Sequence, residues 1–394
     1  MRISAFVVFF LSVLTGMAQN LPVGKRTITY VDASRSNRPV STDLFYPAAS
    51  TGTNTPLAAG TEKYPVVVFG HGFVMSPTAY GWLADSLVKW GFIVAMPNTE
   101  SGFSPSHEQF GRDLAFLAQR ITSLTDSSGN FLFGRVLGKS AIGGHSMGGG
   151  CSFLGMTYNT QVQAVFNFAA AETNPSAKSA AATIQKPALI FSGSQDCIVA
   201  PSEQQVMYSN IPYGCKSYVN ITGALHCQFG NNDGTCVLGQ ISSGCNNSPI
   251  QASVVFEKTI SLLRPFLQHY LKADCVAANQ FEAVFTALTG ATAQRTCSSD
   301  PLGCVITSIP FSPNDQLIKA YPNPASASSG ITVKLLRGMF KEITVLDASG
   351  KAVLHFGQLS SPMIRFTLPT GGIFLVRART EMGIFYRRIV FHNE

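Results

Sequence analysis

The sequence predicts an α/β protein with a mainly parallel sheet, followed by a smaller all-β domain. Short apolar segments such as 64–72, 91–98 and 186–193 recur along the first part of the chain, and segments with helical spacing of apolar residues lie between them. Buried strands that alternate with helices form a parallel sheet covered on both faces. After Cys304 only short β segments divided by Gly, Ser and Pro follow, which indicates a small β-sandwich.

Each element of the first domain has its own signal in the sequence. Apolar runs rich in β-branched and aromatic residues indicate strands, and apolar residues three or four positions apart indicate helices. The expected strands are 26–34, 39–46, 64–72, 91–98, 141–146, 163–170, 186–193 and 217–225, the last with its exit loop. The expected helices are 78–90, with Leu83, Leu87 and Trp90 on one stripe, and 107–124, with Phe110, Leu114, Leu117 and Ile121 on another.

The N-terminal end has the pattern of a secretory signal peptide. Arg2 precedes an apolar run over 5–13, and Gly16 and Ala18 are small residues at the spacing of a cleavage site. The run is shorter than the roughly 20 residues that a membrane anchor needs, so we expect a secreted protein without a transmembrane segment. The expected organisation is a signal peptide at 1–18, a catalytic domain at 19–304, a linker at 305–318 and a β-sandwich at 319–394.

The positive charge is concentrated in the C-terminal part. The net charge is +7, and ten Lys or Arg against four Asp or Glu in residues 316–394 contribute +6 of it. Once Arg2 has left with the signal peptide, residues 3–315 carry no net charge. A neutral main domain offers no electrostatic surface for nucleic acid, so we expect no nucleic-acid partner.

Eight of the nine cysteines lie between 197 and 304. In an exported protein such a cluster indicates disulfide bonds, although spacing alone leaves their pairing open. Cys151 stands apart, and we expect it to be the unpaired, buried thiol.

The motif GHSMG at 144–148 matches the pattern G-x-S-x-G. Between a strand and a helix, this pattern forms a sharp turn that exposes the serine at the top of the sheet. A predicted strand precedes the motif and further small residues follow it. The sequence therefore predicts the α/β-hydrolase fold with Ser146 as the nucleophile.

A serine nucleophile needs a base that is oriented by an acid, and in this fold the chain order is Ser, acid, His. Asp196 follows the predicted strand 186–193, and His226 follows the next strand. We therefore expect Asp196 and His226 to complete the triad. Glu172 is the alternative acid, and His107 is a weaker alternative base because it precedes the serine.

Two backbone N–H groups are expected to stabilise the oxyanion. One is that of Met147, which follows the nucleophile, and the other is that of Phe73, in the loop after strand 64–72. The side chains of Phe73 and Met147 are expected to form apolar walls around the acyl group of the substrate. His71 and His145 are expected to pack or hydrogen-bond beneath the turn rather than to catalyse.

We expect no metal and no cofactor. Residues 231–234 are interpreted as a polar turn rather than a calcium site. The sequence contains neither a Walker motif, nor G-x-G-x-x-G after a strand, nor H-E-x-x-H.

The motifs HGF, GHSMGGG, D-x-x-VAP and GALH, together with YPVVVFGHG and GFIVAMPNT, resemble the bacterial cutinase and polyester-hydrolase branch. Chlorophyllase-like and platelet-activating-factor-acetylhydrolase-like enzymes have similar patterns. The resemblance covers about 64–229 and implies the same roles for the triad and for the two oxyanion donors. Bacterial polyester hydrolases usually place a tryptophan after the strand that matches 163–170, where this chain has Ala170-Ala171-Glu172. The resemblance therefore does not carry aromatic-polyester specificity.

The C-terminal segment 319–394 has a resemblance of its own. Its motifs YPNP at 321–324, ITVLDASGKAV and LPTGGIFLVRA resemble the type A sorting domain of the type IX secretion system of Bacteroidota. The resemblance implies passage through the outer membrane, followed by release or attachment at the cell surface, with the type IX machinery as a partner. The alternative is a carbohydrate-binding or adhesive β module.

The sequence thus predicts a secreted serine carboxylic-ester hydrolase without a cofactor, acting on short or medium acyl esters and on aliphatic polyesters. The alternatives are a catalytically inactive surface binding protein on the same scaffold, and an acyltransferase or amidase with the same triad.

Overall fold

The computed structural model describes residues 21–231, 234–245, 249–297, 300–304, 318–326, 328–336, 338–347, 351–380 and 383–392. The chain divides into two compact units, 1–278 with 290–305 and 279–289 with 306–394. The expected signal peptide and nearly all of the expected linker lie outside the described residues.

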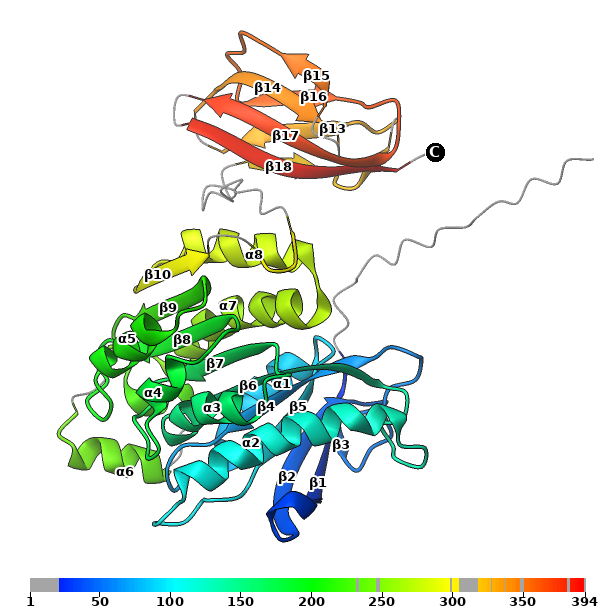
Figure 1. Ribbon diagram of the computed structural model, residues 1–394. Coiled ribbons are helices and arrows are strands. Elements are labelled where there is room, and N and C mark those ends of the chain that lie inside the picture. The colour runs from blue at the N-terminus through cyan, green and yellow to red at the C-terminus, as the bar shows by residue number, and fades with distance from the viewer. Residues whose placement is uncertain are drawn as a thin grey trace, which may run out of the picture. The chain divides into compact units, whose positions relative to one another are not determined.

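The first unit is built around a sheet that has ten strands in the described part of the chain, in the order β10-β9-β8-β7-β6-β4-β5-β2-β1-β3 (Figure 1). The strands from β9 to β5 in this order run parallel. β10 pairs antiparallel with β9, β2 pairs antiparallel with β5 and with β1, and the short edge strand β3 pairs parallel with β1. The predicted mainly parallel sheet is confirmed. The strands are β1 Val23–Asp32, β2 Arg38–Pro47, β3 Gly52–Thr53, β4 Tyr64–Gly70, β5 Ile93–Pro97, β6 Val136–His145, β7 Ala164–Phe168, β8 Ala188–Gly193, β9 Cys215–Ile221 and β10 Ala291–Cys297.

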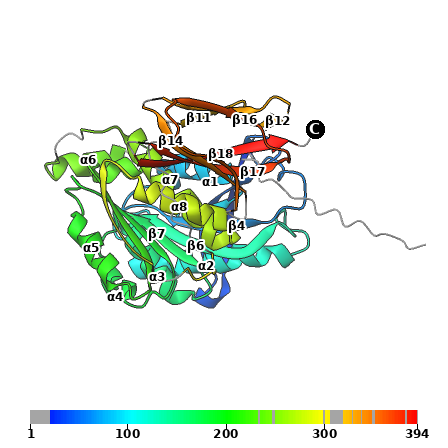
Figure 2. The ribbon, with the colours of Figure 1, turned by 90° about the horizontal axis from the view of Figure 1, so that it is seen from above.

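Helices cover both faces of this sheet (Figure 2). α2, α3 and α5 pack on one face, with α4 beside α3 and α5, and α1 and α7 pack on the other. The helices are α1 Gly81–Val88, α2 His107–Thr122, α3 Met147–Tyr158, α4 Ala177–Ala181, α5 Pro201–Asn210, α6 Gly234–Ser242, α7 Ala252–Lys272 and α8 Cys275–Thr286. The short 3-10 helices are η1 Ala33–Arg35, η2 Pro77–Tyr80, η3 Ser123–Asp126 and η4 His226–Phe229.

For the two predicted helices, the predicted ends agree with the structure to different degrees. α2 starts where Ser106 caps it, since the Ser106 side chain accepts a hydrogen bond from the Gln109 N–H at 3.2 Å. All four of its predicted apolar positions are buried. α1 is shorter than expected and ends at Val88, because the chain turns at Gly91 with φ +74° to enter β5. Trp90 therefore lies beyond the helix, where the Arg264 guanidinium packs over its ring.

Within the second unit, the described residues from 318 to 392 form two sheets that enclose an apolar core. In β13, Ile331, Val333 and Leu335 are buried while the residues between them point outward, as a strand with one buried face requires. The separate C-terminal β region is as predicted. One sheet contains β11 Ile318–Tyr321, β13 Ile331–Leu335 and β16 Met363–Phe366; the other contains β12 Ala325–Ser326, β14 Phe340–Leu346, β15 Ala352–Phe356, β17 Gly372–Thr380 and β18 Gly383–His392.

Candidate active site

Ser146 occupies a strained turn between β6 and α3. Its backbone has φ 53° and ψ −118°, which is rare for a residue with a side chain. A Cβ atom on Gly144 would overlap the Gly148 carbonyl, and one on Gly148 would overlap the Gly70 carbonyl. Only glycine fits these two positions, which explains the spacing of the motif around the serine.

Asp196 and His226 meet at the carboxyl edge of the sheet. Asp196 lies in the loop after β8, His226 begins η4 after β9, and the Asp196 Oδ2 atom is 2.7 Å from His226 Nδ1. The other carboxylate oxygen accepts hydrogen bonds from the N–H groups of Ile198 and Val199, at 2.9 and 2.8 Å. Both side chains are buried. Because the carboxylate accepts from Nδ1–H, Nε2 is the nitrogen left to accept a proton.

The alternative acid and base have other partners. Glu172 is exposed and pairs with the Lys178 ammonium at 3.8 Å. His107 begins α2, and its Nδ1 accepts a hydrogen bond from the Asn174 N–H at 3.0 Å.

A buried hydrogen-bond chain connects the loop after β4 to His226. The Gly72 N–H donates to Tyr80 Oη at 3.0 Å, Tyr80 Oη lies 2.8 Å from His145 Nδ1, and His145 Nε2 lies 3.1 Å from the His226 carbonyl. Complete burial, and then the neighbouring His226, lower the pKa of His145 well below its ordinary value, so the ring is neutral. Since a carbonyl only accepts, Nε2 carries the hydrogen and Nδ1 accepts from the Tyr80 hydroxyl.

Tyr80 was not among the residues that the sequence predicted for the site. Its contact with His145 joins residues that are 65 positions apart in the sequence, so no local sequence pattern predicts this contact.

His71 lies under the same loop, as expected. Its Nδ1 and Nε2 face the carbonyl oxygens of Gly72 and Thr99 at 2.8 and 2.9 Å. Burial lowers the pKa of His71. The Gly148 N–H donates to the His71 carbonyl at 3.1 Å, which joins the turn at Ser146 to the loop that carries Phe73.

The side chains of Phe73 and Met147 have different surroundings. Phe73 is 48% exposed, whereas Met147 is 3% exposed and belongs to the main core of the unit. Phe73 therefore stands at the surface after β4, and Met147 packs inside at the start of α3.

A family model described as PET hydrolase-like matches residues 23–243, more than half of the chain. The chain belongs to this family. Membership makes it an ester hydrolase with a cutinase-like α/β-hydrolase domain. No curated protein matches the chain. The match does not reach 319–394, so the resemblance of that segment to a sorting domain stays a prediction.

In this PET hydrolase-like protein, two of the four disulfide bonds among the described residues adjoin Asp196 and His226. Cys197 and Cys227 directly follow Asp196 and His226 in the chain. Cys151 is unpaired and buried, as expected. The four disulfides are Cys197–Cys245, Cys215–Cys297, Cys227–Cys236 and Cys275–Cys304.

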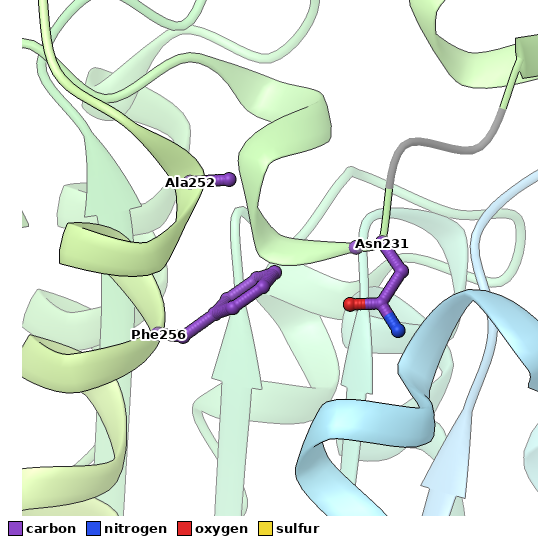
Figure 3. Close-up of a pocket in the computed structure, with 4 residues that line it drawn as sticks. Asn231, Ala252 and Phe256 are labelled. Atoms are coloured by element: carbon purple, nitrogen blue, oxygen red, sulfur yellow. The ribbon is translucent and has the colours of Figure 1, made fainter.

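A pocket of about 270 Å³ lies between the end of η4 and the first turn of α7. Figure 3 shows Phe256 reaching from α7 toward the turn that carries Asn231. The Phe256 ring stacks on Trp82, with ring centroids 4.3 Å apart, and Trp82 Nε1 donates to the Phe229 carbonyl at 3.1 Å. This aromatic pair fixes the backbone just beyond His226 against α1 and α7. The pocket is lined by Gly230, Asn231, Ala252 and Phe256.

Among the described residues, His269, Asp300 and Cys304 bring three donor atoms within 4.8 Å of one another. Cys304 is bonded to Cys275 and offers no thiolate, so only two metal ligands remain. Of the polar turn at 231–234, residues 232 and 233 lie outside the described part of the chain. No helix in that part combines the length and apolar character needed to cross a bilayer.

Proposed function

We propose that the protein is a secreted serine hydrolase of carboxylic esters, with Ser146 as nucleophile, His226 as base and Asp196 as the residue that orients it. The observation that carries the proposal is the buried Asp196–His226 hydrogen bond of 2.7 Å at the sheet edge where the strained turn presents Ser146. That pairing leaves His226 Nε2 to receive a proton.

The reaction follows from these roles. His226 takes the hydroxyl proton of Ser146 as the oxygen attacks the ester carbonyl, and the Asp196 carboxylate stabilises the imidazolium that forms. The N–H groups of Phe73 and Met147 donate to the oxyanion. His226 then protonates the leaving alcohol, and a water activated by the same imidazole releases the acid from Ser146.

The proposed substrates are short or medium acyl esters and aliphatic polyesters. Residues 3–315 carry no net charge, which disfavours selection of strongly charged esters. Ala170 is buried against Gly149, and no aromatic side chain follows β7 in the stretch from Ala170 to Glu172. Aromatic polyesters therefore lack the expected stacking partner and are proposed to be poor substrates.

Residues 319–394 are proposed to direct secretion through the type IX machinery, followed by release or attachment at the cell surface. Their motifs support this role, and the proposed catalytic residues all lie in the first unit.

A fluorophosphonate probe and a p-nitrophenyl butyrate assay test the proposal together. Labelling and turnover are expected in the wild type, and both are expected to be lost in Ser146→Ala. A folded wild-type protein that is neither labelled nor active would favour the inactive binding protein instead.

A further inference from the structure

The first unit contains a second histidine–aspartate pair that the proposed hydrolysis does not use. His269 lies in the last turn of α7, and its Nε2 atom is 2.7 Å from Asp300 Oδ1. Both side chains are buried, with 5% and 4% of their surface exposed. The other carboxylate oxygen of Asp300 accepts a hydrogen bond from the Cys304 N–H at 2.7 Å. Since a carboxylate only accepts, the imidazole donates from Nε2, and Nδ1 is left to face other groups.

His269 Nδ1 faces two atoms that carry lone pairs. The Asp274 carbonyl oxygen is 3.3 Å away, and the Cys304 sulfur is 4.0 Å away. Neither atom can donate a hydrogen bond to the ring, so Nδ1 meets them either as an N–H group or as the ligand of a cation. Because Cys304 is bonded to Cys275, the second sulfur of the disulfide lies one bond further along.

Reduction changes what this cluster can bind. In the oxidised protein the two sulfur atoms carry no charge, because they share the disulfide bond. A dithiol that reduces the bond supplies two electrons and two protons and becomes a disulfide itself, and it leaves two thiols next to one imidazole. The Cα atoms of Cys275 and Cys304 are 5.3 Å apart, so both sulfurs can turn toward His269 Nδ1 by rotation about their Cα–Cβ bonds.

Two thiolates and one imidazole nitrogen form a ligand set that suits zinc. With Zn–S and Zn–N distances of about 2.3 and 2.0 Å, a tetrahedral ion holds its sulfur and nitrogen ligands roughly 3.5 Å apart. His269 Nδ1 and the Cys304 sulfur are already 4.0 Å apart. Histidine ligands of zinc usually donate their other N–H to a carboxylate, and Asp300 accepts this hydrogen bond from His269.

We propose that opening of the Cys275–Cys304 disulfide converts this cluster into a zinc site. His269 Nδ1 and the two sulfurs bind the ion, a water molecule completes the tetrahedron, and Asp300 orients the imidazole. The two thiol protons leave as the ion binds. The site is independent of the proposed hydrolysis, and failure of either proposal leaves the other standing.

Zinc at this site replaces the disulfide as a cross-link. Cys275 and Cys304 lie in the first unit, close in sequence to the two places where the chain passes to the second unit, after residues 278 and 305. The bound ion keeps these two positions together while the disulfide is open, so zinc is expected to restore part of the stability that reduction removes.

The test measures zinc binding by the reduced full chain with a chromophoric zinc chelator as competitor. A phosphine reduces the protein in urea and takes an oxygen atom from water as each disulfide gains two protons, and the protein is refolded without oxygen. Cys275→Ser with Cys304→Ser removes the proposed sulfur ligands. Cys215→Ser with Cys297→Ser is the matched control, since it removes another disulfide, between β9 and β10. Circular dichroism monitors folding.

The reduced wild type and the control are expected to bind about one zinc ion per chain, and the variant without Cys275 and Cys304 none. Replacement of the wild-type zinc by Co²⁺ should give the absorption bands of a tetrahedral ion with thiolate ligands. His269→Asn should abolish binding, whereas Asp300→Asn should weaken it about tenfold to a hundredfold. The oxidised wild type should bind no zinc.

A comparison within the wild-type chain keeps the test decisive if a variant does not fold. Zinc at about a hundredfold excess over its Kd should raise the Tm of the reduced protein by about 5 °C and leave the Tm of the oxidised protein unchanged. The proposal is wrong if the reduced wild type binds no zinc, if the Co²⁺ form shows no thiolate band, or if the variant without Cys275 and Cys304 binds zinc as tightly as the control.

Discussion

Replacing Tyr80 with Phe removes one hydroxyl from the centre of the buried chain between Gly72 and His226. Tyr80 is fully buried, its oxygen accepts from the Gly72 N–H, and its hydrogen is donated to His145 Nδ1. Both groups lose a partner in a place without solvent access. An unsatisfied buried polar group costs about 1–3 kcal/mol, so the variant is expected to lose about 2–6 kcal/mol of unfolding free energy.

The same substitution is expected to lower kcat more than it raises KM. The chain sets the position of Gly72, which precedes the proposed oxyanion donor Phe73, relative to the backbone of His226. Displacements well below 1 Å at such groups affect the transition state more than substrate binding, and we expect a fall in kcat of about tenfold to a hundredfold. Urea unfolding and p-nitrophenyl butyrate kinetics measure the two effects.

Tyr46→Phe is the matched control. Tyr46 is also fully buried, and its hydroxyl donates to the Thr55 carbonyl at 2.7 Å and accepts from Arg26 Nε at 3.1 Å. Tyr46 lies in β2, and its two hydrogen-bond partners lie in β1 and just after β3, so Tyr46→Phe should lose stability while kcat stays the same. The reasoning fails if Tyr80→Phe retains wild-type kcat, or if both variants lose kcat equally.

Four further predictions concern the triad, pH, the thiols and the C-terminal unit. Asp196→Ala should reduce p-nitrophenyl butyrate turnover below about a tenth of wild type, because the His226 imidazole loses the carboxylate that orients it. Glu172→Ala should have turnover close to wild type. The reverse order of the two variants would assign the acid to Glu172. Burial lowers the pKa of His71 and His145 below the value of 6.5 that they regain on unfolding, so the unfolded state binds more protons below that pH. Urea unfolding between pH 7 and pH 5 should therefore show the free energy of unfolding falling with pH, by up to about 1.4 kcal/mol per pH unit for each histidine. His145→Gln should make this dependence on pH less steep. Burial raises the pKa of the Cys151 thiol, so iodoacetamide should label no cysteine in the native oxidised protein and one cysteine in urea. Mass spectrometry counts the labelled cysteines. Several labelled cysteines in the absence of reductant would contradict the disulfide bonds. Deleting 319–394 should leave esterase activity unchanged and retain the protein in the periplasm, and a truncated protein that still reaches the medium would refute the sorting role.

Local patterns in the sequence were sufficient for the main elements of the fold. The alternation of buried strands and helices predicted the parallel sheet, and the burial of Phe110, Leu114, Leu117 and Ile121 on α2 follows from their spacing. The strained turn at Ser146 was also predictable from the local motif. Of the two overlaps that exclude a side chain, however, only that of Gly144 with Gly148 lies within the motif, since a Cβ on Gly148 would overlap the distant Gly70 carbonyl. The C-terminal end of α1 could not be predicted, because the apolar stripe continues to Trp90 although the chain already turns at Gly91.

These features could be predicted because they depend on periodicity and on backbone conformation within a few residues. The tertiary structure was needed to pair the cysteines, since the partners are between 9 and 82 positions apart. It alone placed Tyr80 against His145, and it alone turned Leu238 and Ile241 of α6 toward solvent while Gln240 faces inward. Such contacts depend on the path of the whole chain, because segments distant in sequence become neighbours only when the sheet and its loops have assembled.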